Sequence, residues 1–172
     1  GNAVTVDSGN RAYIAGRTAS TDFPTQTPVQ STLSGGSGTD AFISRVLANG
    51  SALEYSTYLG GNNFDEGLAV TVDIGQNAII AGRTDSTDFP ELNALQKNLA
   101  GGAGTDGFAT RYNSFGTLLS WSTYIGGTGT EQVTGVAIDA NLNAYLTGFT
   151  GSTDLPTLTP FQSVSGGGGL DA

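Results

Sequence analysis

The sequence predicts an all-β protein built from a 66-residue repeat, and three observations support this. The segment GRTASTDFP at residues 16–24 returns as GRTDSTDFP at 82–90 and as GFTGSTDLP at 148–156, so the copies begin 66 residues apart. A fixed period of this kind makes the repeat the structural unit. Short β-branched and aromatic runs alternate with turns rich in Gly, Asn and Asp, and no window shows a helical period.

The first copy contains four expected strands joined by two tight turns and one long loop. The strands are the runs AVTV, AYIAGRT, AFISRVL and LEYSTYL, at residues 3–6, 12–18, 41–47 and 53–59. The turn at 7–10 joins the first two strands, and the turn at 48–51, which contains Asn49-Gly50, joins the last two. A long loop with two prolines, residues 19–39, joins the middle pair.

The second and third copies repeat this order. The second has expected strands at 69–73, 78–84, 107–112 and 119–125, with the long loop at 85–106, and the third has strands at 135–139 and 144–150. We therefore predict two full units, residues 1–66 and 67–132, and one partial unit, residues 133–172.

Four antiparallel strands per repeat favour a β-propeller. Without its loop each repeat keeps about 45 residues, the size of one four-stranded blade, and such a sheet must pack against neighbouring copies. A β-solenoid is the second interpretation, although its coils are shorter and contain no tight hairpins. We expect a buried interior between blades at four pairs of repeat-equivalent residues: Val4 and Val70, Ile14 and Ile80, Phe42 and Phe108, and Tyr55 and Trp121.

The recurring segments also resemble a known family. The order VDSGNRAYIAGRTASTDFP, GGSGTDAFISRV and NGSALEYSTYLGG resembles the SBBP beta-propeller repeat of bacterial and archaeal surface proteins. Phe149 and Leu155 depart from the pattern, where the first copy has Arg17 and Phe23. The resemblance implies a propeller of roughly seven blades outside the cytoplasm and implies no reaction. We also expect the chain to be a fragment of a longer one, whose other blades are its first partners.

Composition excludes several classes of function. Fifteen acidic and six basic residues give a net charge of −9, which opposes binding to nucleic acid. No apolar run is long enough for membrane insertion. Without Cys or His, the chain can form no disulfide, no Ser-His-Asp triad and no His metal ligand. A single Lys among many Ser, Thr and Asn residues favours an extracellular or cell-surface location.

Strand parity predicts where the acidic residues gather. In a four-strand meander the long loops and the connections between repeats share one face, which receives most of the acids. Candidate oxygen ligands for calcium on this face are Asn62, Asn63, Asp65, Glu66 and Glu131. The alternative is that the acids fasten their own loops through backbone N–H groups. Phe23 and Phe89 likewise either stack on a ligand or pack their loop onto its own blade, and we favour the second.

These observations predict a non-enzymatic structural or interaction module of a secreted or surface protein, used for display, adhesion or assembly. Its partners would be other blades and other surface proteins or glycans. The alternative is a calcium-assisted carbohydrate-binding propeller. An enzyme with an active site that spans the blades is the interpretation that the residues support least, and no catalytic residue or certain cofactor is expected.

Overall fold

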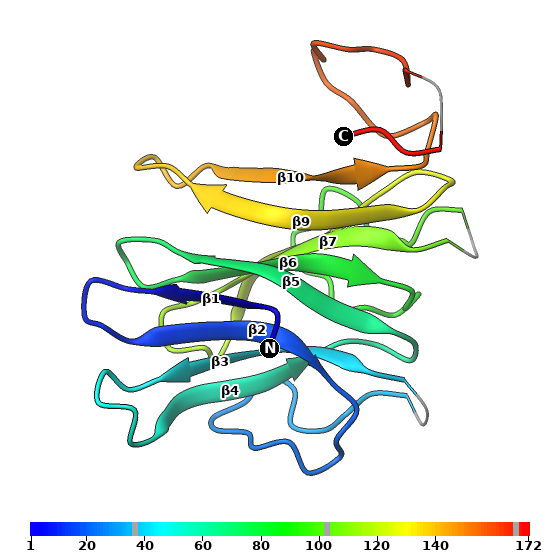
Figure 1. Ribbon diagram of the computed structural model, residues 1–172. Helices are drawn as coiled ribbons and strands as arrows, with labels where there is room; N and C mark the ends of the chain where they lie inside the picture. Colours follow the sequence, from blue (N-terminus) through cyan, green and yellow to red (C-terminus); the bar gives the residue numbers. More distant parts are fainter. Residues whose placement is uncertain (36–37, 102–103, 167–168) are drawn as a thin grey trace.

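The computed structural model describes residues 1–35, 38–101, 104–166 and 169–172. Within these ranges the chain forms ten β-strands and no helix, as Figure 1 shows, so the all-β prediction is confirmed. The strands are β1 (Ala3–Val6), β2 (Ala12–Thr18), β3 (Asp40–Val46), β4 (Leu53–Leu59), β5 (Asp65–Val72), β6 (Ala78–Thr84), β7 (Asp106–Tyr112), β8 (Leu119–Ile125), β9 (Glu131–Ile138) and β10 (Ala144–Thr150). The described part therefore contains no helix that could span a membrane.

The strands form three antiparallel sheets. The first sheet has the order β1-β2-β3-β4 and the second has the order β5-β6-β7-β8, whereas β9 and β10 pair as a two-stranded sheet. The prediction of four antiparallel strands per repeat is thus confirmed for the first two sheets. The predicted boundaries between units, after residues 66 and 132, follow the sequence period. Strands β5 and β9 begin two residues before the second and third units, at Asp65 and Glu131.

The expected start of the second sheet is wrong. We expected Asp65 and Glu66 to lie in the loop before the strand, but both belong to β5. The reason is that β6 is long enough to pair with them, with Asp65 opposite Thr84 and Glu66 opposite Arg83, ahead of a β-bulge. Glu131 begins β9 in the same way.

The three sheets stack face to face (Figure 1). At the first junction β5 lies against β1, β2 and β3, and at the second junction β9 lies against β5, β6 and β7. The first junction encloses a large apolar cluster that includes Tyr13, Ile43, Tyr55, Ile80 and Phe108. The second junction has a smaller buried cluster of Ala81, Ala109 and Val133. Three partly buried side chains pack against this cluster: Trp121, Ile125 and Val136. Most of the apolar core therefore lies between the two complete sheets.

Five of the predicted interior residues are buried. They are at most 9% exposed and comprise Phe42, Tyr55, Val70, Ile80 and Phe108. Four of these five lie in the apolar cluster of the first junction, where the two complete sheets meet. The prediction of an interior between repeats is confirmed at these four positions, whereas Phe42 is buried beneath Phe23 of its own long loop.

Three other interior predictions are wrong because their positions lie at the ends of the stack. Val4 is 66% exposed on the outer side of the first sheet, and Ile14 beside it is only half-buried. Trp121 is also half-buried, because the third sheet has two strands to lay over it instead of four. Repeat-equivalent residues therefore differ in burial according to the neighbour that covers them.

The long loops fold back onto their own sheets. The Phe23 ring lies 4.6 Å from that of Phe42, and the Phe89 ring lies 4.6 Å from that of Phe108. The Tyr58 hydroxyl accepts a hydrogen bond from the Phe23 amide at 3.1 Å and donates one to a carbonyl of the same loop at 2.7 Å. The interpretation that these phenylalanines fasten their loops is confirmed for the described residues, while residues 36–37 and 102–103 of the two loops lie outside them.

The short turns lie at the opposite end of the sheets and repeat one geometry. Asp7 Oδ1 accepts hydrogen bonds from the amides of Gly9 at 2.8 Å and Arg11 at 3.0 Å, as expected for an Asx-type turn. Asp73 and Asp139 hold the corresponding turns through the amides four residues later. The acids of this face are therefore committed to local backbone structure.

Candidate functional site

Two buried carboxylates meet at the first junction beside Gly60. Asp40 at the start of β3 and Asp65 at the start of β5 are both 0% exposed. A Cβ atom on Gly60 would lie 2.6 Å from Asp65 Oδ2 and 2.8 Å from Asp40 Oδ1. The two carboxylates therefore face each other across the Gly60 backbone, and only glycine leaves room for both.

These carboxylates accept hydrogen bonds from the loops around them. Asp65 Oδ2 accepts from the Gly61 amide and from Ser86 Oγ, both at 2.8 Å. Asp40 Oδ2 accepts from the Gln30 side chain at 2.5 Å and from the Ser34 amide at 2.9 Å. Each acid thus connects its strand to a neighbouring loop.

A third acid, Asp88, fastens the connection between β4 and β5. Asp88, in the long loop of the second sheet, accepts a hydrogen bond from the Asn62 amide at 2.8 Å. The Asn63 amide donates to Ser86 Oγ at 2.9 Å. The segment that links the first sheet to the second is therefore held by side chains of the second sheet.

The second junction repeats this arrangement 66 residues later. Asp106 and Glu131 take the places of Asp40 and Asp65, and Asp154 takes that of Asp88. Glu131 Oε2 accepts from the Gly127 amide at 2.9 Å, and Asp154 accepts from the Thr128 amide at 2.9 Å. Replacement of Asp by Glu keeps the bond to the glycine amide, so the arrangement is a property of the repeat.

Burial raises the pKa of three of these carboxyls toward neutrality. It raises the pKa of Asp40 to about 6, that of Asp65 to about 7 and that of Asp106 to about 6. Hydrogen bonds lower each pKa and offset part of this rise. The charge of Asp88 raises the pKa of Asp40 further, and that of Glu131 does the same for Asp106. In the described part of the chain, no arginine or lysine forms an ion pair with these carboxylates.

The structure does not bring the predicted calcium ligands together. Asp65 and Glu66 are neighbours in β5 and point to opposite faces of the sheet. Glu66 forms ion pairs with Arg83 at 2.8 Å and with Arg17 at 3.4 Å.

The remaining predicted ligands are engaged elsewhere. Asn62 and Asn63 donate through their amides to Asp88 and Ser86, and Glu131 belongs to the second junction. Across residues 1–35, 38–101, 104–166 and 169–172, no group of three or more acidic side chains is placed to hold a metal ion.

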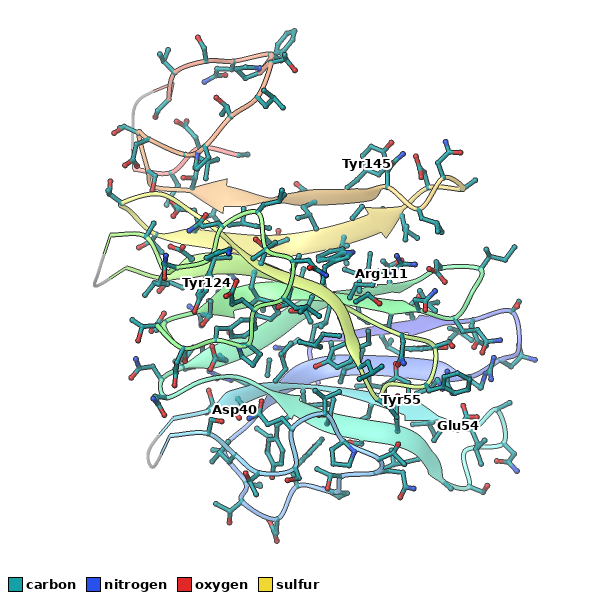
Figure 2. All side chains as sticks on the ribbon, turned by 180° about the vertical axis from the view of Figure 1, so that it is seen from behind. Asp40, Glu54, Tyr55, Arg111, Tyr124 and Tyr145 are labelled. Carbon is teal, nitrogen blue, oxygen red and sulfur yellow. The ribbon has the colours of Figure 1, made fainter. Side chains whose placement is uncertain are left out.

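Sequence reasoning missed the pairing of Asp40 with Asp65. A signal was present, because the spacing from Asp40 through Gly60-Gly61 to Asp65 recurs from Asp106 through Gly126-Gly127 to Glu131. The parity argument placed these acids on one face but did not show that two strands of different sheets meet there. The side chains lie at the long-loop end of the sheets, where Figure 2 labels Asp40 and Tyr124.

An apolar groove was also missed. It has a volume of about 460 Å³ and lies between the outer face of the second sheet and β10. Its apolar lining comes from Leu95, Ala109, Trp121, Ile125, Ala144 and Leu146. The repeat pattern did not predict it, because Tyr55 and Ile80, which correspond to Trp121 and Leu146 in the preceding copies, are fully buried.

Comparison with known proteins identifies the repeat. Residues 120–156 match the family model of SBBP, described as a beta-propeller repeat. The matched segment runs from β8 through β9 and β10 to the DLP segment, so it crosses the second junction. No curated protein matches the chain. The match confirms the resemblance seen in the sequence, and a beta-propeller repeat supports an interaction or structural module in general terms.

Proposed function

We propose that this chain is a non-enzymatic structural and interaction module of a secreted or cell-surface protein, used for display, adhesion or assembly. The proposal rests on one observation: the polar and aromatic side chains that recur with the 66-residue period hold the sheets and loops to one another. Asp88 accepts a hydrogen bond from Asn62 in the connection between the first two sheets, and Tyr58 accepts one from Phe23 in the first long loop.

The chemistry of the buried acids supports the same interpretation. Asp40, Asp65 and Asp106 have pKa values in the range that suits acid–base catalysis, but each is 0% exposed and out of reach of a substrate. With no His and no Cys, the chain has no imidazole base and no thiol nucleophile to work beside them. The raised pKa values of the paired acids instead link the stability of the fold to pH.

A surface setting is supported by composition. The net charge of −9 and the single Lys97 leave an exterior rich in hydroxyl, amide and carboxylate groups, which remains soluble at high concentration. A chain without Cys needs no particular redox environment to keep its fold.

The test is accessibility on intact cells of the organism that makes the protein. An antibody raised against the folded repeat should label unpermeabilised cells or be captured from the culture medium, and added protease should remove the label. An intracellular marker protein serves as the control for cell integrity. Labelling that requires permeabilisation would overturn the proposed setting.

A further inference from the structure

One exposed turn carries a sequence motif that the proposed function does not use. The turn between β3 and β4 contains Asn49-Gly50-Ser51, and Asn49 is the only asparagine of the chain with Ser or Thr two positions later. An asparagine followed by any residue except proline, and then by Ser or Thr, is the acceptor pattern for N-linked oligosaccharides. The pattern is short enough to arise by chance, so the geometry of the turn has to support it.

The turn presents this motif to solvent at the short-turn end of the first sheet. The Leu47 amide donates a hydrogen bond to the Ala52 carbonyl at 3.0 Å, and the Gly50 amide donates one to the Leu47 carbonyl at 2.8 Å. Gly50 has a φ of 70°, which glycine adopts without strain. All three residues of the motif are exposed. Figure 2 shows Glu54, just after the turn, at the opposite end of the sheet from Asp40.

The same turn position is exposed where a neighbouring sheet packs against the turn. In the second sheet Phe115 corresponds to Asn49, and the next residue is again a glycine, Gly116. A Cβ atom on Gly116 would overlap the ring of Tyr55 in the first sheet, yet Phe115 beside it is 70% exposed. The exposure of Asn49 is therefore a property of this turn position and does not depend on whether a further sheet packs against the turn.

The Asn49 side chain is held by its carbonyl oxygen, and its amide nitrogen is free. Asn49 Oδ1 accepts hydrogen bonds from the Ser51 amide at 3.0 Å and from Ser51 Oγ at 2.7 Å. Because a backbone N–H can only donate, the atom that faces it is the carbonyl oxygen and the other is Nδ2. Among the described residues, Asn49 Nδ2 has no hydrogen-bond partner. The nitrogen that an oligosaccharide would join therefore lies in solvent.

The two hydrogen bonds also favour attack by this nitrogen. A carboxamide nitrogen becomes nucleophilic as it loses a proton, and negative charge then develops on the carbonyl oxygen. The Ser51 hydroxyl and amide already donate to that oxygen in Asn49, so they stabilise the charge as it forms.

The turn resists the competing reaction of an Asn-Gly pair. In that reaction the Gly50 nitrogen attacks Asn49 Cγ, ammonia leaves, and water opens the resulting ring to aspartate or isoaspartate. The Gly50 amide is instead bonded to the Leu47 carbonyl at 2.8 Å, and Ser51 holds the side-chain carbonyl of Asn49. Both contacts have to break before the ring can close, so the asparagine persists as an acceptor.

We propose that Asn49 is the acceptor of an N-linked oligosaccharide. The co-reactant is an oligosaccharide joined through phosphate to a polyprenyl lipid. Asn49 Nδ2 forms a bond to C1 of the first sugar, and the bond between C1 and the phosphate oxygen breaks. The lipid phosphate leaves with the bonding electrons, and the proton that Nδ2 loses passes to it. This inference rests on the cell-surface setting proposed above, because N-linked sugars belong to surface loops of secreted proteins.

The test has two parts. Mass spectrometry of the protein from the organism that makes it should find sugar on Asn49, within the tryptic peptide that runs from Val46 to Arg83. In the second part, the folded 172-residue protein is incubated with an oligosaccharyltransferase specific for this acceptor pattern and with its polyprenyl-linked oligosaccharide. We expect a single glycan, seen as one shifted band on a gel. The second part does not depend on where the protein resides in the cell.

Matched variants make the result specific. Asn49→Gln should abolish the transfer. Ser51→Ala should slow it at least about tenfold, because a hydrogen bond to the oxygen on which charge develops is lost, whereas Ser51→Thr should preserve it. Asn113→Gln is the control in the equivalent turn of the second sheet, where the motif is absent, and it should change nothing. Circular dichroism checks that each variant is folded.

The second sheet also allows the motif to be transplanted. Phe115→Asn would place an asparagine before Gly116 and Thr117, which complete the pattern. The backbone of this turn repeats that of the first, since the Gly116 amide donates to the carbonyl of Asn113, three residues earlier, at 3.0 Å. We therefore expect a second glycan on this variant. A folded variant without one would contradict the claim that the turn presents the amide.

The outcomes separate this inference from the proposed function. Unmodified Asn49 in protein that the antibody detects on intact cells would overturn the inference and leave the proposed function standing. Aspartate or isoaspartate at this position, without sugar, would show that ring closure is faster and would also overturn it. Transfer to the purified protein together with an intracellular location would overturn the proposed setting and leave the acceptor site standing.

Discussion

Asp40 and Asp65 face each other across the backbone of Gly60, although they belong to different sheets. Burial raises the pKa of Asp40 to about 6 and that of Asp65 to about 7, above the ordinary value of 3.8 that applies to the unfolded chain. The folded state therefore binds protons more tightly than the unfolded state does. The stability that comes from these protons is fully present below pH 3.8 and is lost as the pH rises through about 6 and 7.

We accordingly predict that the free energy of unfolding rises as the pH falls from about 8 to about 5. Each carboxyl contributes up to about 1.4 kcal/mol per pH unit within its window. Urea denaturation at a series of pH values measures the effect, and Asp65→Asn should reduce the slope. A stability that stays constant over this range would show that the paired acids are solvated.

A second group of acids makes the protein less stable again at low pH, below the range in which the buried acids stabilise it. Burial raises the pKa of Asp7 and of Asp73, but hydrogen bonds from neighbouring residues outweigh burial and leave both pKa values lowered. Their contribution is present above pH 3.8 and is lost as the pH falls below it. Maximum stability should therefore lie near pH 4 to 5, between the two windows, and the same denaturation series would locate it.

Gly60→Ala should destabilise the protein by about 1–3 kcal/mol. The new methyl group would lie within 2.8 Å of both junction carboxylates, and neither can move without loss of its hydrogen bonds. Gly151→Ala is the matched control, because the nearest atoms to its Cβ are at 3.5 Å. Thermal unfolding compares the two, and an equal change in Tm would contradict the close approach at Gly60.

Asp88→Ala should cost about 1 kcal/mol, because it removes the acceptor for the Asn62 amide. Asp22 is the repeat-equivalent residue in the first copy and accepts no such amide hydrogen bond from the described residues, so Asp22→Ala should change stability by less than about 0.5 kcal/mol. Chemical denaturation of both variants measures the difference. Equal effects would mean that Asp88 acts within its own loop only.

Phe108→Ala should cost about 3–5 kcal/mol, since the side chain is 0% exposed and packs against Phe89. Phe42→Ala should cost nearly as much, because Phe23 covers it in the same way. Val4→Ala, at a position 66% exposed, should cost less than about 0.5 kcal/mol. A cost below about 1 kcal/mol for Phe108→Ala would show that Phe108 is not in the core and that the opposite face of β7 is buried.

Calcium at millimolar concentration should leave the Tm unchanged. Glu66 is committed to Arg17 and Arg83, and Asp65 is buried on the other face of the strand, so the predicted ligands do not converge. A ligand that binds the native state must raise the Tm. A rise that Glu66→Gln abolishes would revive the calcium interpretation, and magnesium at equal ionic strength is the control.

The sequence predicted the strands well because each strand is a local pattern between clear turns. The period located repeat-equivalent residues, and the tight turn at Asn49-Gly50 set the hairpin. Burial could not be predicted from the period alone. Val4 and Val70 occupy equivalent positions, yet one is 66% exposed and the other 9%, because burial depends on the neighbouring sheet.

The candidate site was harder to predict for a similar reason. Asp65 and Glu66 are adjacent in sequence and were expected to act together, but a strand separates their side chains onto two faces. Asp40 and Asp65 are 25 residues apart and meet only because two sheets stack. Contacts between sheets follow from the packing of complete units, which a local pattern does not encode.

The segment that matches the family, residues 120–156, crosses from one sheet into the next, and the same positions one period earlier are residues 54–90. Within 54–90 lie Gly60, Gly61, Asp65, Ser86 and Asp88, which form the hydrogen bonds that hold the connection between the first two sheets. A gene duplication that copies one 66-residue period therefore copies a four-stranded sheet together with the side chains that fasten it to the next sheet. An array of this kind can change its length by whole units without any new interface having to evolve.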